Sequence, residues 1–490
     1  MSTDKDGHGL VETVAIKSDS DSNDAVLNEY KKAPWWSYIW DYDPDRTRTE
    51  RKFIQKLDVF LLTIFCFGYF IKNLDQTNIG NAYISGMKED LKMNGNELNL
   101  IDVAWTTGYV IGQLPSQLIL TKVRPSIWIP SCELVWTILT FCLAAAKTSN
   151  HVIAIRFFVG LVESIFYPAA LFLLGSWYKP SELGKRAGIL HASSAGAGMF
   201  SGYLQAAVYK GLNGVHGKAG WQWLFIMDGV ISLPICIAGY FLIPDLPENT
   251  RAFYLNEDDR NLARKRMDDI GRAPRRKLGW SILKRVFTRW HVYAFALLYI
   301  VFINTASSGS VVPLALWMKS NHWGVTDINV IGTGLSAVQL VTTVSFAILS
   351  DFLRQRAPVM VLAAFLGFLC SLFLTIWNIP DGLKWFSFFM TRGAVVLGPL
   401  SMSWANEVMG NDAEERALVL GIMNAGGYAF AAWLPLLTYP VKEAPVFRKG
   451  FAWSTASFIM QGLVVGGIAL LERRDKRRKG RREEVVVTED

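Results

Sequence analysis

Arg156 and Glu163 stand seven residues apart in the segment Arg156-Phe-Phe-Val-Gly-Leu-Val-Glu163, inside a long run of otherwise apolar residues. Seven residues make about two turns of an α-helix, so both side chains lie on one face. A run of this length predicts a membrane span, in which a charge is costly unless it meets a partner or water. Charged residues in such a position mark a pathway for a substrate or a proton.

The two charges have different expected roles. Glu163 lies near the middle of the span and Arg156 about 10 Å nearer the outer surface, too far for a direct pair along the helix axis. Arg156 can instead bind another helix or an anionic ligand through its planar guanidinium. The low dielectric favours the neutral form of Glu163, which suits a proton carrier, and the alternative is a structural hydrogen bond between helices. Tyr167 follows on the same face, and Pro168 loosens the helix there.

A second polar group ends the first apolar stretch, which reads Tyr69-Phe-Ile-Lys72-Asn-Leu-Asp75-Gln-Thr-Asn78. Lys72 and Asp75 are three residues apart and can form an ion pair on one helix face, with the lysine extending toward the outer surface. In the functional interpretation, Lys72 attracts the carboxylate of a substrate, while Asp75 and Asn78 shape the mouth of the pathway. The sequence leaves both interpretations open.

Twelve apolar stretches have roughly the 20 residues needed to cross a bilayer. These spans run about 55–78, 97–120, 126–146, 151–177, 184–209, 221–243, 291–317, 328–350, 357–377, 384–408, 415–439 and 451–471. Basic residues gather before span 1, after spans 2, 4 and 8, in the central loop and after span 12, which are all on one side when counted by alternate crossings. The excess of Lys and Arg therefore predicts that both termini and the central loop are cytoplasmic.

The sequence thus predicts an all-α membrane protein with 12 transmembrane helices in two six-helix bundles. The expected parts are a largely disordered cytoplasmic tail at 1–50, a first bundle at 51–243, a central loop at 244–290, a second bundle at 291–471 and a basic cytoplasmic tail at 472–490. Two halves of equal span number predict a binding site at their interface near the middle of the membrane.

Further polar residues fall inside apolar runs, among them Asp228, Asn304, Arg392 and Asn424. Each by itself is most often a hydrogen bond between helices. Asn304 is followed by the small polar stretch Thr305-Ala-Ser-Ser-Gly-Ser310, which is typical of a broken helix that lines a site.

The sequence gives no support to several function classes. It has no phosphate-binding Gly-Lys-Ser/Thr loop, no His/Cys metal cluster and no Gly-x-Ser-x-Gly turn, so we expect no enzyme activity and no cofactor. The net charge of +8 comes mainly from polar segments beside membrane spans. It therefore indicates loop topology and contact with anionic lipid headgroups, not binding of nucleic acid.

Several of these segments together resemble a known family. They are Asn73-Leu-Asp75-Gln-Thr-Asn78, the 156–168 segment, Gly220-Trp-Gln-Trp-Leu-Phe-Ile-Met-Asp228-Gly229, Leu246-Pro-Glu248 and Trp404-Ala-Asn-Glu407. Over residues 50–472 the chain resembles the major facilitator superfamily, and within it the fungal allantoate permease branch of anion:cation symporters. The run from Tyr83 to Asn99 is most similar to the pantothenate permeases, a subgroup that includes relatives for biotin and similar vitamins.

The chain departs from the family pattern in two places. The loop signature after span 2 is degraded, since Gln113 to Pro125 lacks the usual acidic residue and glycine-arginine pair. The corresponding segment after span 8, Ser350-Asp351-Phe-Leu-Arg354-Gln-Arg356, is better preserved. The resemblance implies that Asp351, Arg354 and Arg356 act in gating at the cytoplasmic face. Asp228 stands where the family more often has Glu.

The resemblance implies a proton-coupled symporter for a small organic anion, most simply pantothenate, that works by alternating access. Glu163 and Asp228 would couple to protons. The side chains expected at the substrate are Lys72, Asp75, Asn78, Arg156, Tyr167, Asn304, Arg392, Trp404 and Asn424. The alternatives are uptake of allantoate, nicotinate or biotin, export of a carboxylate metabolite, and a nutrient sensor that does not transport. We expect a monomer in the plasma membrane.

Overall fold

The computed structural model describes residues 46–120, 122–268, 280–306, 311–353, 355–409 and 413–489. The chain divides into two units, Met1–Lys52 and Phe53–Asp490. In the first unit the described residues are 46–52, which include the start of helix α2 (Arg48–Leu57). The rest of the tail that the sequence predicts to be disordered lies outside the described residues.

The second unit is helical throughout its described regular structure. Here residues 53–268 are called the first half and residues 280–489 the second half. After α2, the helices of the first half are α3 (Thr63–Ala82), α4 (Lys88–Asp90), α5 (Glu97–Leu120), α6 (Pro125–Leu143), α7 (Ser149–Glu163), α8 (Phe166–Trp177), α9 (Pro180–Leu212), α10 (Gly220–Leu242) and α11 (Glu257–Asp268).

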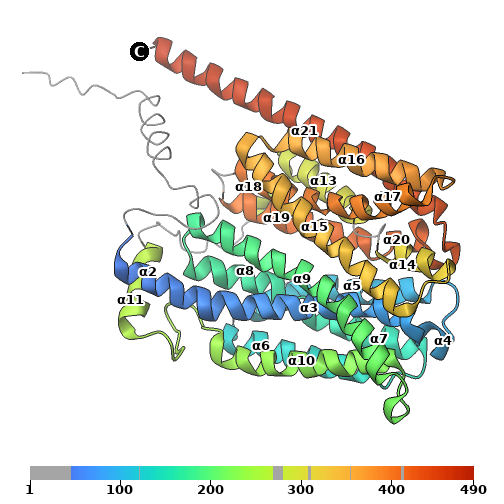
Figure 1. The fold of residues 1–490 in the computed structure, drawn as a ribbon. Helices are drawn as coiled ribbons and strands as arrows, with labels where there is room; N and C mark the ends of the chain where they lie inside the picture. Colours follow the sequence, from blue (N-terminus) through green and yellow to red (C-terminus); the bar gives the residue numbers. More distant parts are fainter. Residues whose placement is uncertain are drawn as a thin grey trace, which may run out of the picture. The chain divides into compact units, whose positions relative to one another are not determined.

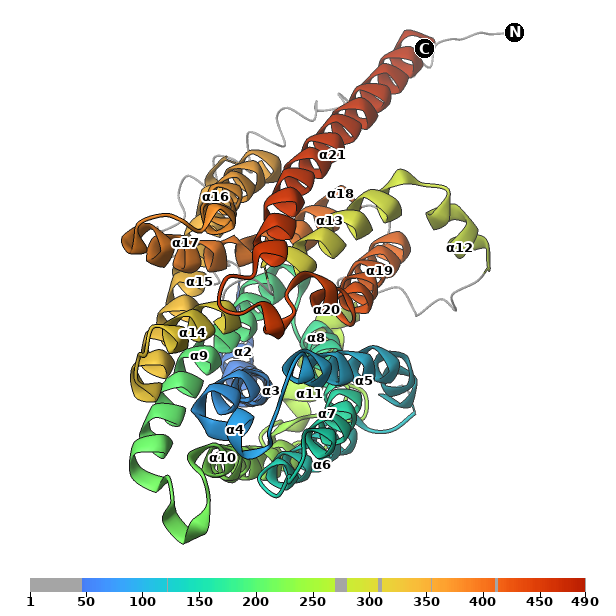
Figure 2. The same ribbon diagram turned by 90° about the vertical axis from the view of Figure 1, so that its right-hand side faces the viewer.

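The second half continues the same pattern. Its helices are α12 (Trp280–Phe287), α13 (Trp290–Ala306), α14 (Val311–Ser320), α15 (Val325–Leu353), α16 (Arg356–Ile376), α17 (Asp381–Gly393), α18 (Leu397–Val408), α19 (Ala413–Ala431), α20 (Leu434–Thr438) and α21 (Arg448–Glu489). Figure 1 shows the helices of the first half, in blue to green, packed beside those of the second half, in yellow to red, and Figure 2 gives the view turned by 90°.

Eight helical stretches in the described residues are long and apolar enough to cross a membrane. They are Arg48–Asp90, Pro125–Leu143, Ser149–Trp177, Gly220–Leu242, Val325–Ser350, Arg356–Ile376, Leu418–Glu443 and Arg448–Arg478. The other four predicted spans coincide with α5, with α9, with the pair α13 and α14, and with the pair α17 and α18. Each predicted span therefore contains one or two helices in its described residues, and eight of the spans are long and apolar enough to cross a membrane.

The break between α7 and α8 has a covalent cause. Pro168 has no N–H and its ring clashes with the carbonyl of the residue four positions earlier, which is Ser164. The α-helix is interrupted at Ser164 and Ile165, and the Ser164 hydroxyl donates to the carbonyl oxygen of Leu161 at 2.7 Å. The loosened turn that the sequence predicts at Pro168 is thus present, and it lies directly after Glu163.

Three buried apolar clusters organise the second unit. One consists of first-half residues such as Phe65, Trp136 and Phe166. Another consists of second-half residues such as Phe295 and Trp404. The third draws on both halves and joins residues at the α4 end of the helices to α14 and to the start of α21. Each half therefore has a core of its own, and the shared core holds them together at the α4 end.

Polar contacts between the halves lie at the same α4 end. The Lys319 ammonium is 2.8 Å from a Glu89 carboxylate oxygen, and the Asn329 amide donates to the Ser85 hydroxyl at 3.2 Å. Asn99 bonds the backbone of the segment between α20 and α21, at the carbonyl of Tyr439 and the N–H of Val441. These contacts tie α4, α5 and the segment between α3 and α4 to the second half.

Helix α9 shows how the packing between halves changes along its length. A Cβ atom at Gly198 would lie 2.4 Å from the Ser336 hydroxyl, and one at Gly202 would lie 2.5 Å from the Asn329 carbonyl oxygen, both on α15. Gly184 and Gly188, nearer the α11 end, face open space. The two helices therefore touch closely toward the α4 end and do not make the same contact toward the α11 end.

The α11 end of the first half is closed by charged contacts. Arg266 of α11 donates to both carboxylate oxygens of Glu182 at 2.6 and 2.7 Å. Arg186 of α9 binds Asp58 through Nε and Nη2, at 2.6 and 2.8 Å. Helix α11 lies in the central loop and packs on the first half, with Ala263 fully buried.

The contact between α5 and α7 depends on glycine. A Cβ atom at Gly160 would lie 2.0 Å from the Trp105 carbonyl oxygen, and one at Gly108 would lie 2.1 Å from that of Phe157. We predict that Gly160→Ala lowers stability by about 1–3 kcal/mol or more, because the two backbones must move apart. Thermal unfolding of the purified protein measures this, with Gly211→Ala as the control because Gly211 faces open space. Equal unfolding temperatures for the two variants would contradict the close contact.

Candidate functional site

Five ionisable side chains meet inside the first half. They are Lys72 and Asp75 of α3, Arg156 and Glu163 of α7, and Asp228 of α10, and none is more than 4% exposed. We call them the buried charge cluster. Charges at this depth are stable only with close partners or by gaining or losing a proton. The contacts of each member therefore decide what the cluster can do.

Asp75 and Arg156 form an ion pair between α3 and α7. The Arg156 Nη1 lies 3.7 Å from the Asp75 Oδ1, and the Thr140 hydroxyl donates to the other oxygen of Asp75 at 3.0 Å. The predicted pair of Asp75 with Lys72 is wrong, because α7 brings the guanidinium to Asp75. Asp75 and Lys72 are both buried, at 1% and 4% exposed. The prediction that Arg156 binds another helix is confirmed.

Glu163 accepts two hydrogen bonds from neighbouring helices. The Trp105 indole N–H donates to its Oε2 at 2.9 Å, and the Gln76 amide donates to the same oxygen at 3.4 Å. Its Oε1 has no hydrogen-bond partner among the described residues. The carboxyl is thus held in place through one oxygen, and the other oxygen is available to carry a proton.

Asp228 has a different environment. The Asn78 amide donates to its Oδ2 at 2.7 Å, the Ser201 hydroxyl donates to Asn78 at 2.5 Å, and the Asn81 amide donates to Ser201 at 2.7 Å. Its Oδ1 has no hydrogen-bond partner in the described part of the chain, and no ion pair is recorded for it there. This chain of polar groups connects Asp228 to α9, the helix that packs on the second half.

Lys72 lies against three aromatic rings. Its ammonium nitrogen is 4.8 Å from the ring centre of Tyr109, 5.5 Å from that of Trp105 and 5.9 Å from that of Tyr69. No hydrogen bond or ion pair of Lys72 is recorded within the described residues. Cation–π contacts stabilise an ammonium without neutralising it. Lys72 is therefore a buried amine that lies against ring faces and makes no recorded ion pair among the described residues.

The second half reaches this position through Tyr428. The ring of Tyr428 on α19 lies 5.1 Å from that of Tyr109, centre to centre. The sequence predicts that Tyr167 lines the pathway. Its ring centre is 5.2 Å from that of Tyr69, which is one of the three rings against Lys72. The Tyr167 hydroxyl is also 2.8 Å from the Nε2 of His191. The aromatic groups around Lys72 thus come from both halves.

The predicted second-half residues make their recorded contacts elsewhere. The Asn304 amide donates to the Ile300 carbonyl oxygen of its own helix at 2.8 Å, and its side-chain oxygen has no hydrogen-bond partner among the described residues. The Trp404 indole donates to Glu472 at 3.0 Å within the second-half core. Arg392 and Asn424 are half-buried. Within the described residues, no recorded contact joins these four side chains to the buried charge cluster.

The predicted gating residues are described only in part. Arg356 donates from Nη2 to the Glu407 carboxylate at 2.6 Å and from Nη1 to the Ser350 hydroxyl at 2.9 Å. These contacts connect α15, α16 and α18 inside the second half. Arg354 and the side chain of Asp351 lie outside the described residues.

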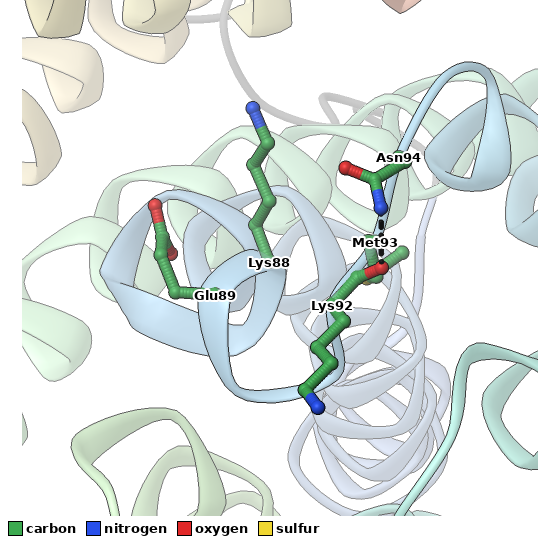
Figure 3. A pocket seen from close by; sticks show the side chains of 5 residues that line it. All are labelled: Lys88, Glu89, Lys92, Met93 and Asn94. Carbon is green, nitrogen blue, oxygen red and sulfur yellow. Dashed lines mark hydrogen bonds between the residues drawn. The ribbon is translucent and has the colours of Figure 1, made fainter.

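A surface hollow lies at the α4 end, separate from the buried charge cluster. Figure 3 shows its lining, which is Lys88, Glu89, Lys92, Met93 and Asn94. The Asn94 amide donates to the Lys92 carbonyl oxygen at 3.1 Å across this turn. The hollow is wide open to solvent and its polar groups are half-buried or exposed, so it lacks the burial of the cluster.

Residues 65–435 match the family model described as Major Facilitator Superfamily. The chain belongs to the major facilitator superfamily. Solved members share the fold at low identity. The D-xylose-proton symporter has a TM-score of 0.64 at 12% identity, and the match covers 84% of this chain and 97% of the symporter. A bacterial homologue of the lysosomal transporter Spinster has a TM-score of 0.57 at 13% identity, and the match covers 84% of this chain and 95% of the homologue.

Three fungal superfamily members are similar along most of their length. The MFS transporter PfmaC of Pestalotiopsis fici is 38% identical over 90% of this chain and 84% of its own. The pantothenate transporter liz1 of Schizosaccharomyces pombe is 36% identical over 88% and 84%. The pantothenate transporter FEN2 of Saccharomyces cerevisiae is 34% identical over 86% and 83%.

Sequence reasoning missed several residues that surround the buried charge cluster. Trp105, Tyr109 and Tyr428 surround Lys72 or lead to it, yet an aromatic residue in a span resembles ordinary core. Thr140 binds Asp75, yet a hydroxyl in a span most often bonds its own helix. Their spacing could have identified two of them, because Trp105 and Tyr109 are four residues apart and share one face of their helix.

We predict that removing one partner of the Asp75–Arg156 pair is more harmful than removing both. Arg156→Gln leaves Asp75 buried without its cation, at a cost of about 3–5 kcal/mol. Adding Asp75→Asn removes the remaining charge, so the double variant is expected to recover part of that loss. A double-mutant cycle on the free energy of unfolding measures the coupling. Strictly additive losses would contradict a direct pair.

Proposed function

We propose that the protein is a proton-coupled symporter that brings a small organic anion, most simply pantothenate, into the cell across the plasma membrane. The observation that carries this proposal is Lys72, a buried amine against aromatic rings that makes no ion pair within the described residues, near three buried carboxyls. Membership of a transporter superfamily and the similarity to two proteins named pantothenate transporters support it.

The proposed arrangement is 12 membrane spans in two six-helix bundles, at 51–243 and 291–471, in a monomer. The loop at 244–290, the N-terminal tail and the C-terminal tail are placed in the cytoplasm, which makes the α11 end cytoplasmic. The halves are joined at the α4 end and part along α9 toward the α11 end. This supports an inward-facing state, from which rocking of the bundles would open the α4 end.

The substrate carboxylate is proposed to bind the Lys72 ammonium. A charged hydrogen bond of this kind contributes about 1.5–3 kcal/mol. Pantothenate also has an amide and two hydroxyl groups, which need polar partners in a buried site. Tyr428, Tyr167 and His191 offer hydroxyl and imidazole groups around the same aromatic cluster. Since Tyr428 belongs to the second half, a substrate at Lys72 would contact both bundles.

Proton coupling follows from the charge balance of the cluster. It has three acids and two bases, so one carboxyl must carry a proton for the empty cluster to be neutral. A bound monoanion adds one negative charge, and neutrality then requires one more proton. We assign the standing proton to Asp228, which has no recorded ion pair, and the substrate-linked proton to Glu163. Movement of the anion inward costs about 2.3 kcal/mol per 100 mV, and the accompanying proton cancels this cost.

A second candidate substrate is biotin, because the vitamin H transporter of Saccharomyces cerevisiae is 30% identical over 92% of this chain and 78% of its own. Biotin also carries one carboxylate, so the charge argument applies equally. Competition for uptake of labelled pantothenate by biotin, nicotinate and allantoate separates these substrates. Net efflux from preloaded vesicles without a proton gradient would favour export.

We predict that a proton ionophore abolishes concentrative uptake of labelled pantothenate by cells that lack their own permease. Glu163→Gln is expected to lower this uptake at least tenfold, because an amide still accepts the Trp105 hydrogen bond but cannot release a proton. Uptake that is indifferent to the ionophore would exclude proton coupling. Wild-type accumulation by Glu163→Gln would remove that residue from the role.

We also predict that Lys72→Met weakens the apparent affinity for pantothenate about 10- to 150-fold, because the charged bond to the carboxylate is lost. Methionine keeps the length and apolar stem of lysine, so the aromatic contacts are largely retained. Lys92→Met at the surface is the matched control and should behave as wild type. An unchanged affinity in Lys72→Met would show that another group binds the carboxylate.

A further inference from the structure

Glu133 is a buried ionisable residue outside the cluster, and the proposed cycle does not yet use it. It lies in the middle of α6 and is 3% exposed. Two glycines on neighbouring helices leave space for the Glu133 carboxyl. A Cβ atom at Gly68 of α3 would lie 2.6 Å from the Glu133 Oε1, and a Cβ atom at Gly239 of α10 would lie 3.2 Å from its Oε2. Three helices therefore enclose this carboxyl inside the first half.

Within the described part of the chain, Glu133 has no recorded ion pair. Its Oε2 has no hydrogen-bond partner among the described residues, and neither has the indole nitrogen of Trp136, which is 1% exposed. The titratable groups recorded beside it are the thiols of Cys132 on its own helix and Cys236 on α10. The Cys236 thiol bonds the Pro130 carbonyl oxygen at 3.3 Å. A structural glutamate would be expected to have its polar atoms bonded, so this one is unusual.

A stripe of polar side chains leads from Glu133 to the buried charge cluster. Thr137 and Thr140 follow it at four and seven residues, on the same face of α6, and both are at most 2% exposed. The Thr140 hydroxyl donates to Asp75 at 3.0 Å, and the Thr137 hydroxyl donates to the Glu133 carbonyl oxygen at 2.8 Å. The stripe spans about 10 Å along the helix axis.

Glu133 lies on the side of the cluster that faces the α11 end. Helix α6 begins at that end, where the Ser126 N–H donates to Asp245 at 3.2 Å. The Trp177 indole bonds the backbone of the same Asp245 at 3.2 Å. Glu133 is thus eight residues into the helix from the end that is proposed to be cytoplasmic, and Thr140 is fifteen residues in.

We propose that Glu133 is a proton relay between the buried charge cluster and the cytoplasm. This rests on the proposed symport. The Glu133 carboxyl releases its proton toward cytoplasmic water, which breaks one O–H bond and leaves a carboxylate. That carboxylate then takes a proton from the cluster along the face of α6 that carries Thr140 and Thr137. Each hydroxyl gives one proton and accepts another, and the Thr137 hydroxyl must turn away from the Glu133 backbone carbonyl to do so. No electron is transferred, and the cluster carboxyl returns to its ionised state.

The test separates proton release from substrate movement in proteoliposomes. Exchange of labelled for unlabelled pantothenate at equal concentrations needs no net proton release, whereas uptake driven by an acid-outside gradient does. Glu133→Gln is expected to keep exchange within about twofold of wild type and to lose at least tenfold in net uptake and in proton entry reported by a trapped pH dye. Glu133→Asp, which keeps a carboxyl, is expected to restore part of both.

Two results would overturn the relay. Glu133→Gln with wild-type net uptake would show that the residue needs no exchangeable proton. Equal losses of exchange and net uptake, in a variant that unfolds at the wild-type temperature, would show a packing role. If the wild-type protein moves no protons with pantothenate, the proposed function itself fails. If it does and Glu133→Gln is unaffected, only the relay fails.

Discussion

The structure depends on one constraint, which is the charge balance of five ionisable side chains away from water. Three carboxyls and two cations occupy the interior of the first half, and each is almost fully buried. A buried net charge is far more expensive than a proton taken from solution at moderate pH. The number of protons that the cluster holds must therefore follow the number of other charges near it, including that of a bound anion.

The fold keeps these charges in fixed positions and leaves some of their polar atoms without a hydrogen-bond partner among the described residues. The glycine contact of α5 with α7 brings Trp105 against Glu163, and the break before Pro168 follows directly after that carboxyl. Lys72 lies against ring faces and makes no ion pair within the described residues. Tyr428 is one place where the second half meets this arrangement, so occupancy of the Lys72 position and movement of the halves are physically linked.

The sequence predicts which charged residues are energetically costly to bury, but it does not predict which of them form pairs. Arg156, Glu163 and Asp228 were found because a charge in an apolar run needs a reason. The pairing of Lys72 with Asp75 was wrong, since a spacing of three along one helix says nothing about a guanidinium arriving from another. Glu133 carries the same signal as Glu163 and was missed because its polar neighbours, two threonines, are ordinary in a span. The second-half residues remain predictions, because no recorded contact joins them to the cluster.

The most direct test of the charge balance is to supply the two driving forces separately to proteoliposomes that contain the wild-type protein. One condition is an acid-outside pH gradient with the membrane potential held at zero, and the other is an inside-positive potential with no pH gradient. The account predicts that labelled pantothenate accumulates in the first condition, because each anion enters with at least one proton. Accumulation only in the second would show that the anion crosses alone, and it would contradict the account.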